Sequence, residues 1–314
     1  MEEIKHLCGC LPSPPDERDY QAKDYLAMGV RPKSYIPAVT ASIHTQEYDD
    51  CTAFALAAAK FYHEERERKS QMAFSPLYSF FDREESDWQG EGRYLREVLN
   101  AAKKRGIARV CDIPQGMPYE AKYPNRGISN VLSTVRDKAA EFKIAAYARA
   151  ADLDEAAECI YQHGAALISL PVRVSFDAFV LKKESEMVLP VPKETERIRG
   201  YHAVCAMGYT EDGVIIQNSW GEAWGAKGFA ILPWDYPITE VWTMIDEKKK
   251  WDLIELPIKA EYAKVNGKDV PLDVPAQILN GRTMVPIRFV AEALGCEVEW
   301  LAKEKTVVIR REVK

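Results

Sequence analysis

The 314-residue sequence lacks several features that would assign it to a large class of proteins. No apolar run approaches the roughly 18 residues that a membrane-spanning helix needs, so no membrane span is predicted. The N-terminal residues lack the basic start and apolar stretch of a secretory signal peptide. The formal net charge is −6, which gives no indication of binding to nucleic acid or to an anionic membrane.

The seven cysteines do not form the pattern of a disulfide framework, because their number is odd and they are scattered along a long chain. A reducing compartment is therefore expected. Cys8 and Cys10 are the nearest approach to a metal-binding pair, but no second pair follows at zinc-finger spacing, so no metal or other cofactor is predicted. Without a signal peptide the expected location is the cytoplasm, with the cell surface or exterior as the alternative.

The order of the predicted elements indicates an α+β fold. Residues 1–45 are rich in proline and are predicted to lie extended over the core. Apolar residues then recur at helical spacing from residue 51, and further helices are predicted at 75–110, with breaks, at 129–140 and at 152–163. Gly106 is the predicted end of a helix, and Asp152–Asp154 contain the predicted N-cap of the last one. From residue 164 onward, short β-rich runs are divided by glycine, proline and aspartate. A helical half therefore precedes a strand half.

A second, smaller domain is predicted at the C-terminus. The charged stretch "DEKKKWD" at 246–252 is typical of a surface connection. The residues beyond it contain an Asn-Gly hairpin signal at Asn266, a short amphipathic helix closed by Gly295, and two strands. We therefore expect domains at 1–256 and 257–314.

The junction "DDCTAFALAAA" places Cys51 in the first turn of a predicted helix, with Asp49 or Asp50 as its N-cap. A helix N-terminus and a nearby imidazolium both lower the pKa of a thiol, and the thiolate is the nucleophilic form. His202 begins an apolar strand, and Asn218 ends the next one. If these strands pair, the asparagine oxygen accepts an imidazole N–H and orients the ring, while Trp220 shields that hydrogen bond.

These blocks resemble the papain-like cysteine peptidases of the bacterial type. "DDCTAFALAAA" is similar to the nucleophile helix of that family, and "YHAVCAMGYTEDGVIIQNSWGEAWGAKGFAIL" to its histidine strand and Asn-Ser-Trp-Gly hallmark. "LPSPPDERDY" resembles the Pro-Asp-x-Arg-Asp segment that opens the mature domain, so the likeness covers residues 10–235. It implies a helical lobe and a β-barrel-like lobe with the substrate, a peptide or protein, bound between them.

The resemblance also implies roles for individual residues. Cys51 would attack a peptide carbonyl to form a thioester, His202 would carry the proton and Asn218 would orient His202. Gln46 would complete the oxyanion hole with the Cys51 backbone N–H, and Trp220 would support the histidine. Substrate-binding roles are implied for Gly90, Gly92 and Ala203. No long inhibitory pro-segment is expected, because Cys51 lies near the start of the sequence.

One departure from the family pattern leaves alternatives open. Gln46 lies one residue closer to Cys51 than usual, and "EYDD" replaces the usual glycines between them. The principal prediction is a cysteine-type endopeptidase. The alternatives are a weak or inactive papain-fold binding protein, and an acyl transferase such as a transpeptidase or deamidase that uses the same Cys-His pair.

The C-terminal segment resembles the small domain called copper amine oxidase N-terminal-like. The stretch "NGRTMVPIRFVAEALG" carries this likeness. Copper is not implied, because the segment contains no histidine and a single cysteine is not a metal site. The accessory domain is expected to bind a surface or another copy of the protein.

Overall fold

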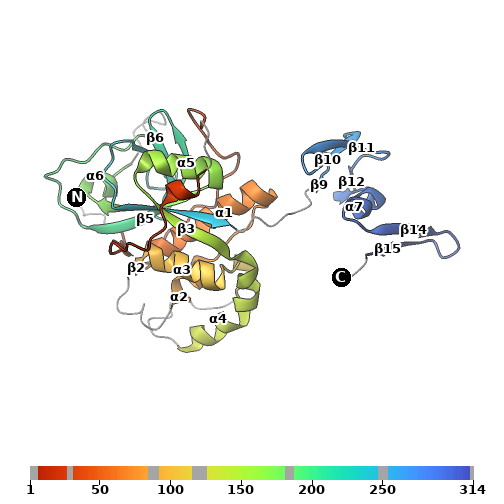
Figure 1. The fold of residues 1–314 in the computed structure, drawn as a ribbon, viewed down its shortest axis with the longest axis horizontal. Coiled ribbons are helices and arrows are strands. Elements are labelled where there is room, and N and C mark those ends of the chain that lie inside the picture. Colours follow the sequence, from red (N-terminus) through yellow and green to blue (C-terminus); the bar gives the residue numbers. More distant parts are fainter. Residues whose placement is uncertain are drawn as a thin grey trace. The chain divides into compact units, whose positions relative to one another are not determined.

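The computed structural model describes residues 6–26, 31–83, 92–114, 126–180, 187–246 and 254–311. The chain forms two compact units, 1–247 and 248–314 (Figure 1). This division falls before the boundary predicted after residue 256, because strand β9 (Ile254–Glu255) pairs with β10 (Tyr262–Val265) of the second unit. No helix in the described parts of the chain is long and apolar enough to cross a membrane.

Helix α1 (Cys51–Arg68) is the central helix of the first unit and begins at the predicted residue. Most of its side chains are buried, including the alanines that let neighbouring elements approach closely. Asp50 occupies the N-cap position, but its side chain does not make the predicted capping hydrogen bond. The helix ends at Arg68, and its C-cap residue, Lys69, adopts the left-handed conformation with a φ of 53°.

One face of α1 packs against a six-stranded antiparallel sheet. In spatial order the strands are β3 (Ile144–Ala150), β8 (Glu240–Asp246), β4 (Ala166–Val172), β5 (Gly200–Thr210), β6 (Gly213–Gln217) and β7 (Phe229–Pro233). Every residue of β4 is buried, because helices cover both faces of the sheet. Helix α5 (Leu153–His163) covers the face opposite α1, and the Asp152 side chain caps it by accepting the Glu155 N–H.

The other helices gather beside α1 and form the helical part of the first unit (Figure 1). They are α2 (Pro76–Phe81), α3 (Leu95–Arg105) and α4 (Arg126–Ala139), and 3-10 turns follow at Val110–Asp112 and Ala140–Phe142. Gly106 ends α3 as predicted, with a φ of +88°. A Cβ atom at Gly106 would lie 1.9 Å from the carbonyl oxygen of Ala139, so glycine is required for this close approach.

The N-terminal segment crosses the first unit in an extended conformation. Strand β1 (Cys10–Leu11) pairs in parallel with β2 (Arg93–Tyr94), which directly precedes α3. A 3-10 turn at Ala22–Asp24 follows, and a short helix α6 (Val174–Asp177) lies after β4.

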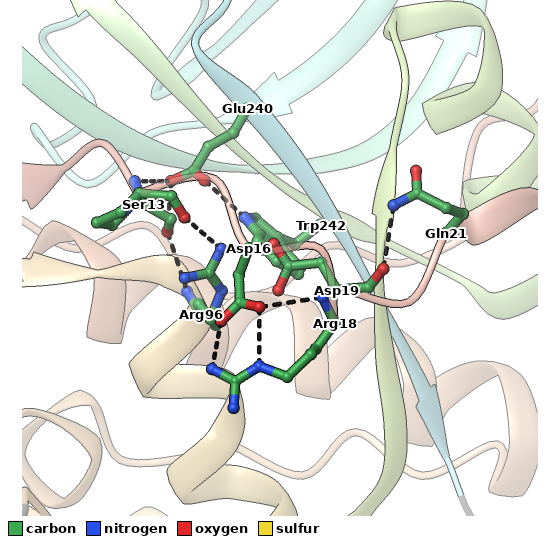
Figure 2. A network of polar contacts seen from close by, with 9 residues as sticks. Ser13, Asp16, Arg18, Asp19, Gln21, Arg96, Glu240 and Trp242 are labelled. Atoms are coloured by element: carbon green, nitrogen blue, oxygen red, sulfur yellow. Dashed lines mark hydrogen bonds and ion pairs between the residues drawn. The ribbon is translucent and has the colours of Figure 1, made fainter.

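A polar network anchors this segment at Ser13 (Figure 2). The Ser13 N–H and hydroxyl both donate to the Glu240 carboxylate, which also accepts the Trp242 indole N–H at 2.9 Å. Arg96 on α3 donates to the Asp19 carboxylate and to the Pro14 carbonyl oxygen. Charge-assisted hydrogen bonds of this kind are strong, so the segment is tied to both the sheet and the helices.

The second unit consists of short hairpins and one helix. A three-stranded sheet joins β9, β10 and β11 (Lys268–Pro271), and two-stranded sheets join β12 (Gln277–Leu279) with β13 (Arg282–Met284) and β14 (Glu297–Leu301) with β15 (Thr306–Arg310). Helix α7 (Ile287–Ala293) lies between these two hairpins in the sequence. Asn266 and Gly267 both have positive φ in the β10–β11 turn, which confirms the predicted Asn-Gly hairpin.

Candidate active site

Cys51 lies where the N-terminus of α1 meets strand β5. The backbone N–H of Ala203 donates to its sulfur over 3.4 Å. The side chain is fully buried, and α1 packs against β5 over much of its length. Ala203, the residue next to His202 in the sequence, therefore contacts the predicted nucleophile.

His202 and Asn218 meet because β5 and β6 are antiparallel neighbours, with Cys205 opposite Gln217. The His202 Nε2 atom lies 2.7 Å from Asn218 Oδ1. Because an amide oxygen only accepts hydrogen bonds, this contact places the proton on Nε2 and leaves Nδ1 with a free electron pair. No hydrogen-bond partner among the described residues reaches Nδ1. The Ser219 N–H also donates to Asn218 Oδ1, at 2.8 Å, and holds the amide in place.

Trp220 covers the imidazole of His202. The two rings stack with centroids 4.4 Å apart and an angle of 28° between their planes. Trp220 is itself 4% exposed, and Phe176 packs against its edge. The indole therefore covers the ring that makes the His202–Asn218 hydrogen bond.

Gln46 is held at the site despite the shortened loop. Its backbone N–H donates to the Ser219 carbonyl oxygen at 2.8 Å, and its side-chain oxygen accepts the Ser219 hydroxyl at 2.6 Å. Its Nε2 donates to the carbonyl oxygens of Tyr48 at 2.8 Å and Leu7 at 3.4 Å. The side-chain amide thus points at a peptide carbonyl that lies within the site.

Residues 6–13 lie across Cys51, and we call them the strap. Gly9 packs directly against the backbone of Asp49, two residues before Cys51, and its carbonyl oxygen accepts the Arg93 N–H at 2.8 Å. His6 stacks on Trp220 with centroids 4.3 Å apart and contacts Asp177 at 2.8 Å. The chain that precedes Cys51 therefore covers its thiol.

The strap also occupies one of the positions predicted to bind substrate and contacts the predicted oxyanion donor. Gly92 packs against the Gly9 carbonyl oxygen and the Leu11 side chain. Leu7 accepts hydrogen bonds at its carbonyl oxygen from Gln46 and, at 3.2 Å, from the Trp220 indole N–H. Gly90, the other predicted glycine, lies outside the described residues.

Burial beneath the strap changes the ionisation of both reacting groups. Removal from water raises the pKa of Cys51 to about 12. The Ala203 N–H, which donates to the sulfur, acts in the opposite direction because it stabilises the thiolate. The same effect lowers the pKa of His202 to about 3, although its hydrogen bond to Asn218 acts in the opposite direction. The covered site therefore holds a neutral thiol and a neutral imidazole at pH 7.

One residue of the sequence indicates the strap. The residue between Cys8 and Cys10 is a glycine, and it lies against the backbone of Asp49, two residues before Cys51. A Cβ atom at position 9 would lie 1.8 Å from the Asp49 carbonyl oxygen. A glycine in an otherwise extended, proline-rich stretch is a sign of such a close backbone approach.

Two protein-family models match the sequence. The family model for papain family cysteine proteases matches residues 50–236, which include Cys51, His202 and Asn218. The chain belongs to the papain family of cysteine proteases. The model of the copper amine oxidase N-terminal domain matches residues 239–309, a range that begins near β8 of the first unit.

Similar proteins are known both from sequence and from solved structures. An uncharacterized peptidase C1-like protein of Acanthamoeba polyphaga mimivirus is 24% identical over 270 residues, which cover 76% of this chain and 84% of that protein. Xylellain, a cysteine protease from Xylella fastidiosa, matches with a TM-score of 0.61 and 21% identity, over 79% of this chain and 99% of its own.

Two further solved structures share the fold. A procathepsin B from Trypanosoma congolense matches with a TM-score of 0.57 and 14% identity, covering 78% of this chain and 88% of its own. The bromelain protease from Ananas comosus matches with a TM-score of 0.53 and 17% identity, over 69% of this chain and all of its own. At these identities the likeness describes the papain-like α+β fold, to which this chain adds a small β-rich C-terminal unit.

Proposed function

We propose that the protein is a cysteine peptidase that cleaves peptide bonds through Cys51, His202 and Asn218. The observation that carries this proposal is the 2.7 Å contact between His202 Nε2 and Asn218 Oδ1. It leaves Nδ1 as the ring atom of the buried imidazole that can take a proton. The Cys51 sulfur accepts the N–H of Ala203, the residue after His202, and in the proposal the Cys51 thiol supplies that proton.

In the proposed reaction His202 Nδ1 takes the thiol proton as the Cys51 sulfur attacks the substrate carbonyl carbon. The carbonyl oxygen becomes negatively charged and is stabilised by Gln46 Nε2 and the Cys51 backbone N–H. The carbon–nitrogen bond then breaks, and the departing amine takes the proton from His202. Water, activated by the same imidazole, hydrolyses the thioester and restores the thiol.

The position of Gln46 supports the active reading of the shortened loop. Its Nε2 donates to the Tyr48 carbonyl oxygen of the loop at 2.8 Å and also reaches that of Leu7 in the strap at 3.4 Å. The amide therefore reaches a peptide carbonyl oxygen of the strap even while the shortened loop binds it. A hydrogen-bond donor that is already in place where the negative charge develops stabilises that charge with little reorganisation.

The described state is the covered one, so the proposal requires that the strap be displaced before substrate binds. Cys51 and His202 are each fully buried, and strap backbone occupies the contacts that a substrate would make. Contact with water stabilises charged groups, so uncovering the pair favours transfer of the thiol proton to the imidazole.

The test is covalent labelling of the full chain with an epoxide inhibitor of papain-like enzymes, followed by peptide mapping. We expect labelling at Cys51, which Gly9→Ala accelerates and His202→Ala abolishes. Cys111→Ser serves as the control, because Cys111 is an exposed thiol outside the site. Absence of Cys51 labelling between pH 5 and 8, even in Gly9→Ala, would contradict the proposal, provided that the variant is folded.

A further inference from the structure

Glu240 is a buried carboxylate beneath the strap that has only neutral partners. The residue is 3% exposed. Its two oxygens accept hydrogen bonds from the Ser13 N–H and hydroxyl and from the Trp242 indole N–H. In the part of the chain that the structure describes, no lysine, arginine or histidine forms an ion pair with it. A buried carboxylate is ordinarily paired with a cation, so the fold leaves the charge of Glu240 without its usual partner.

Two arginines approach Trp242 but form no ion pair with Glu240. The guanidinium groups of Arg96 and Arg149 lie over the Trp242 ring, with their central carbon atoms 5.6 and 5.9 Å from its centroid. Arg96 donates instead to the Asp19 carboxylate, as Figure 2 shows. The positive charge of Arg96 is therefore already matched by an anion of the segment that follows the strap.

Glu240 lies at the end of a row of side chains that begins beside the nucleophile. In the register of the sheet, Ser169 on β4 lies opposite Ala203 on β5 and opposite Glu240 on β8. Directly opposed residues of antiparallel strands point to the same face, and three of them in a row span about 10 Å. The Ala203 N–H contacts the Cys51 sulfur, so this row leads from the thiol to the Glu240 carboxylate.

The strap lies along this row in the covered state. The Cys10 sulfur is 3.3 Å from the Ser169 hydroxyl, and the Ser13 hydroxyl is 3.1 Å from the Glu240 carboxylate. Ser169 and Glu240 are both buried. Displacement of the strap therefore uncovers the two residues together and removes two of the three hydrogen-bond donors from the carboxylate.

The two ends of the strap show which half of a substrate would meet Glu240. At one end, the Leu7 carbonyl oxygen accepts the Trp220 indole N–H at 3.2 Å. At the other end, Ser13 contacts Glu240. Trp220 stacks on His202, which in the proposed reaction gives its proton to the departing amine. The amine half of a substrate thus leaves beside Trp220, and the acyl half extends toward Glu240.

We propose that Glu240 selects substrates that carry a lysine or an arginine two or three residues before the bond that is cleaved. The inference rests on the proposed function, because it names the substrate class of the same site. An extended chain advances about 3.3 Å per residue. A peptide whose carbonyl carbon is at Cys51 therefore passes Ser169 and brings a long basic side chain to Glu240 within that number of residues.

Ser13 occupies the place of this cation while the site is covered. It satisfies the carboxylate with two hydrogen bonds but supplies no positive charge. A hydrogen bond from a charged donor to a carboxylate is about twice as strong as one between neutral groups, so a basic peptide competes with the strap for Glu240. An apolar side chain at that position would leave a buried carboxylate short of donors, and an acidic one would repel it.

The experiment measures peptide cleavage in the Gly9→Ala chain, in which the strap is displaced. Peptides carry lysine, norleucine or glutamate at the second or third residue before the cleaved bond, which mass spectrometry of the products identifies. Norleucine keeps the length of the lysine side chain without its charge. We expect kcat/KM for the lysine peptide to exceed that for the norleucine peptide by a factor of about 10 to 150, the range for a hydrogen bond to a charged group. The glutamate peptide should be the poorest substrate.

Glu240→Gln in the same chain should remove most of the preference for lysine over norleucine. Glu211→Gln is the matched control, because it makes the same chemical change at an exposed carboxylate that pairs with Lys33. It should leave the ratio of the two rates unchanged. An equal preference for lysine in the Gly9→Ala chain and in its Glu240→Gln variant would overturn the proposal. Norleucine cleaved as fast as lysine at both positions would also overturn it, and this comparison does not depend on the folding of Glu240→Gln.

Binding of the same peptides to the Gly9→Ala chain with Cys51→Ala requires no catalysis and separates the two proposals. Tighter binding of the lysine peptide that depends on Glu240, in a protein that cleaves no peptide, would contradict the proposed function alone. Cleavage of peptides with no preference that depends on Glu240 would contradict only this inference.

Discussion

Gly9 and Asp49 pass each other so closely that a Cβ atom on Gly9 would lie 1.8 Å from the Asp49 carbonyl oxygen. Asp49 belongs to the loop that leads into Cys51, so this contact sets the strap directly against the nucleophile. No real Cβ atom approaches a backbone oxygen that closely, and the neighbouring backbone is held by the Gln46 and Ser219 hydrogen bonds.

The first prediction follows from this contact. Gly9→Ala displaces the strap, because the added methyl group collides with backbone and not with a flexible side chain. We expect Cys51 to react faster with the epoxide inhibitor, by a factor of about 5 to 150 if the collision costs about 1–3 kcal/mol. The rate of labelling at equal inhibitor concentration measures the effect.

Leu7→Ala is the matched control in the same strap. The Leu7 side chain is exposed, and the site contacts its carbonyl oxygen, which the substitution retains. Its labelling rate should remain near that of the wild type. Equal rates for Gly9→Ala and the wild type would show that the strap does not limit access to Cys51.

The second prediction concerns the hydrogen bond between His202 and Asn218. Asn218→Ala leaves the buried imidazole N–H without its acceptor, at a cost of about 1–3 kcal/mol, and releases the ring from its orientation. Cleavage of a peptide substrate by the Gly9→Ala background should then slow by a factor of about 5 to 150. Asn218→Asp retains an acceptor at the same atom and should keep more of the activity than Asn218→Ala; the opposite order would contradict the assigned tautomer.

Local signals predicted much of this fold correctly. The start of α1 at Cys51, the end of α3 at Gly106 and the N-cap at Asp152 each depend on residues within one or two helical turns. The pairing of β5 with β6, which joins His202 to Asn218, was also predictable because the two strands are neighbours in sequence.

The parts of the fold that local sequence patterns did not predict depend on contacts between residues far apart in the chain. Strand β3, with the sequence "IAAYARA", carries small side chains and little alternation, and it becomes a strand by pairing with β8 nearly a hundred residues away. The strap depends on contacts of the same kind, since Gly9 contacts Asp49 and Arg93, which are distant in sequence. Its place across the site was not predicted, because a single glycine indicates a close backbone approach but does not tell which part of the chain it approaches.

The third prediction separates the role of Gln46 from that of the thiol. Gln46→Ala removes a donor to the carbonyl oxygen, and loss of one such donor typically slows acyl transfer by a factor of about 10² to 10³. Alkylation of Cys51 by iodoacetamide forms no oxyanion, so its rate should be unchanged. Both rates are measured in the Gly9→Ala background. A parallel fall in the two rates would show that Gln46 supports only the structure of the loop.

The final prediction concerns pH and begins from His202, whose pKa burial lowers from 6.5 to about 3 in the covered state. The covered state therefore requires the neutral imidazole, whereas the uncovered state takes up a proton below pH 6.5. Covering is fully favoured above pH 6.5 and weakens as the pH falls toward 3, by about 1.4 kcal/mol for each pH unit in this window. His6 and Arg199 both face His202 and disfavour its charged form, and His6 also contacts Asp177.

Hydrogen exchange of the strap amides measures this equilibrium, because strand β1 of the strap pairs with β2 and the Ser13 N–H donates to the Glu240 carboxylate in the covered state. After correction for the intrinsic pH dependence of exchange, protection of residues 6–13 should fall by about tenfold between pH 6 and pH 5. His202→Gln, which does not titrate, should remove this dependence, and His6→Gln tests the separate contribution of the contact with Asp177. Protection that is constant or rises on acidification in the wild type would show that the neutral state of His202 does not control the strap.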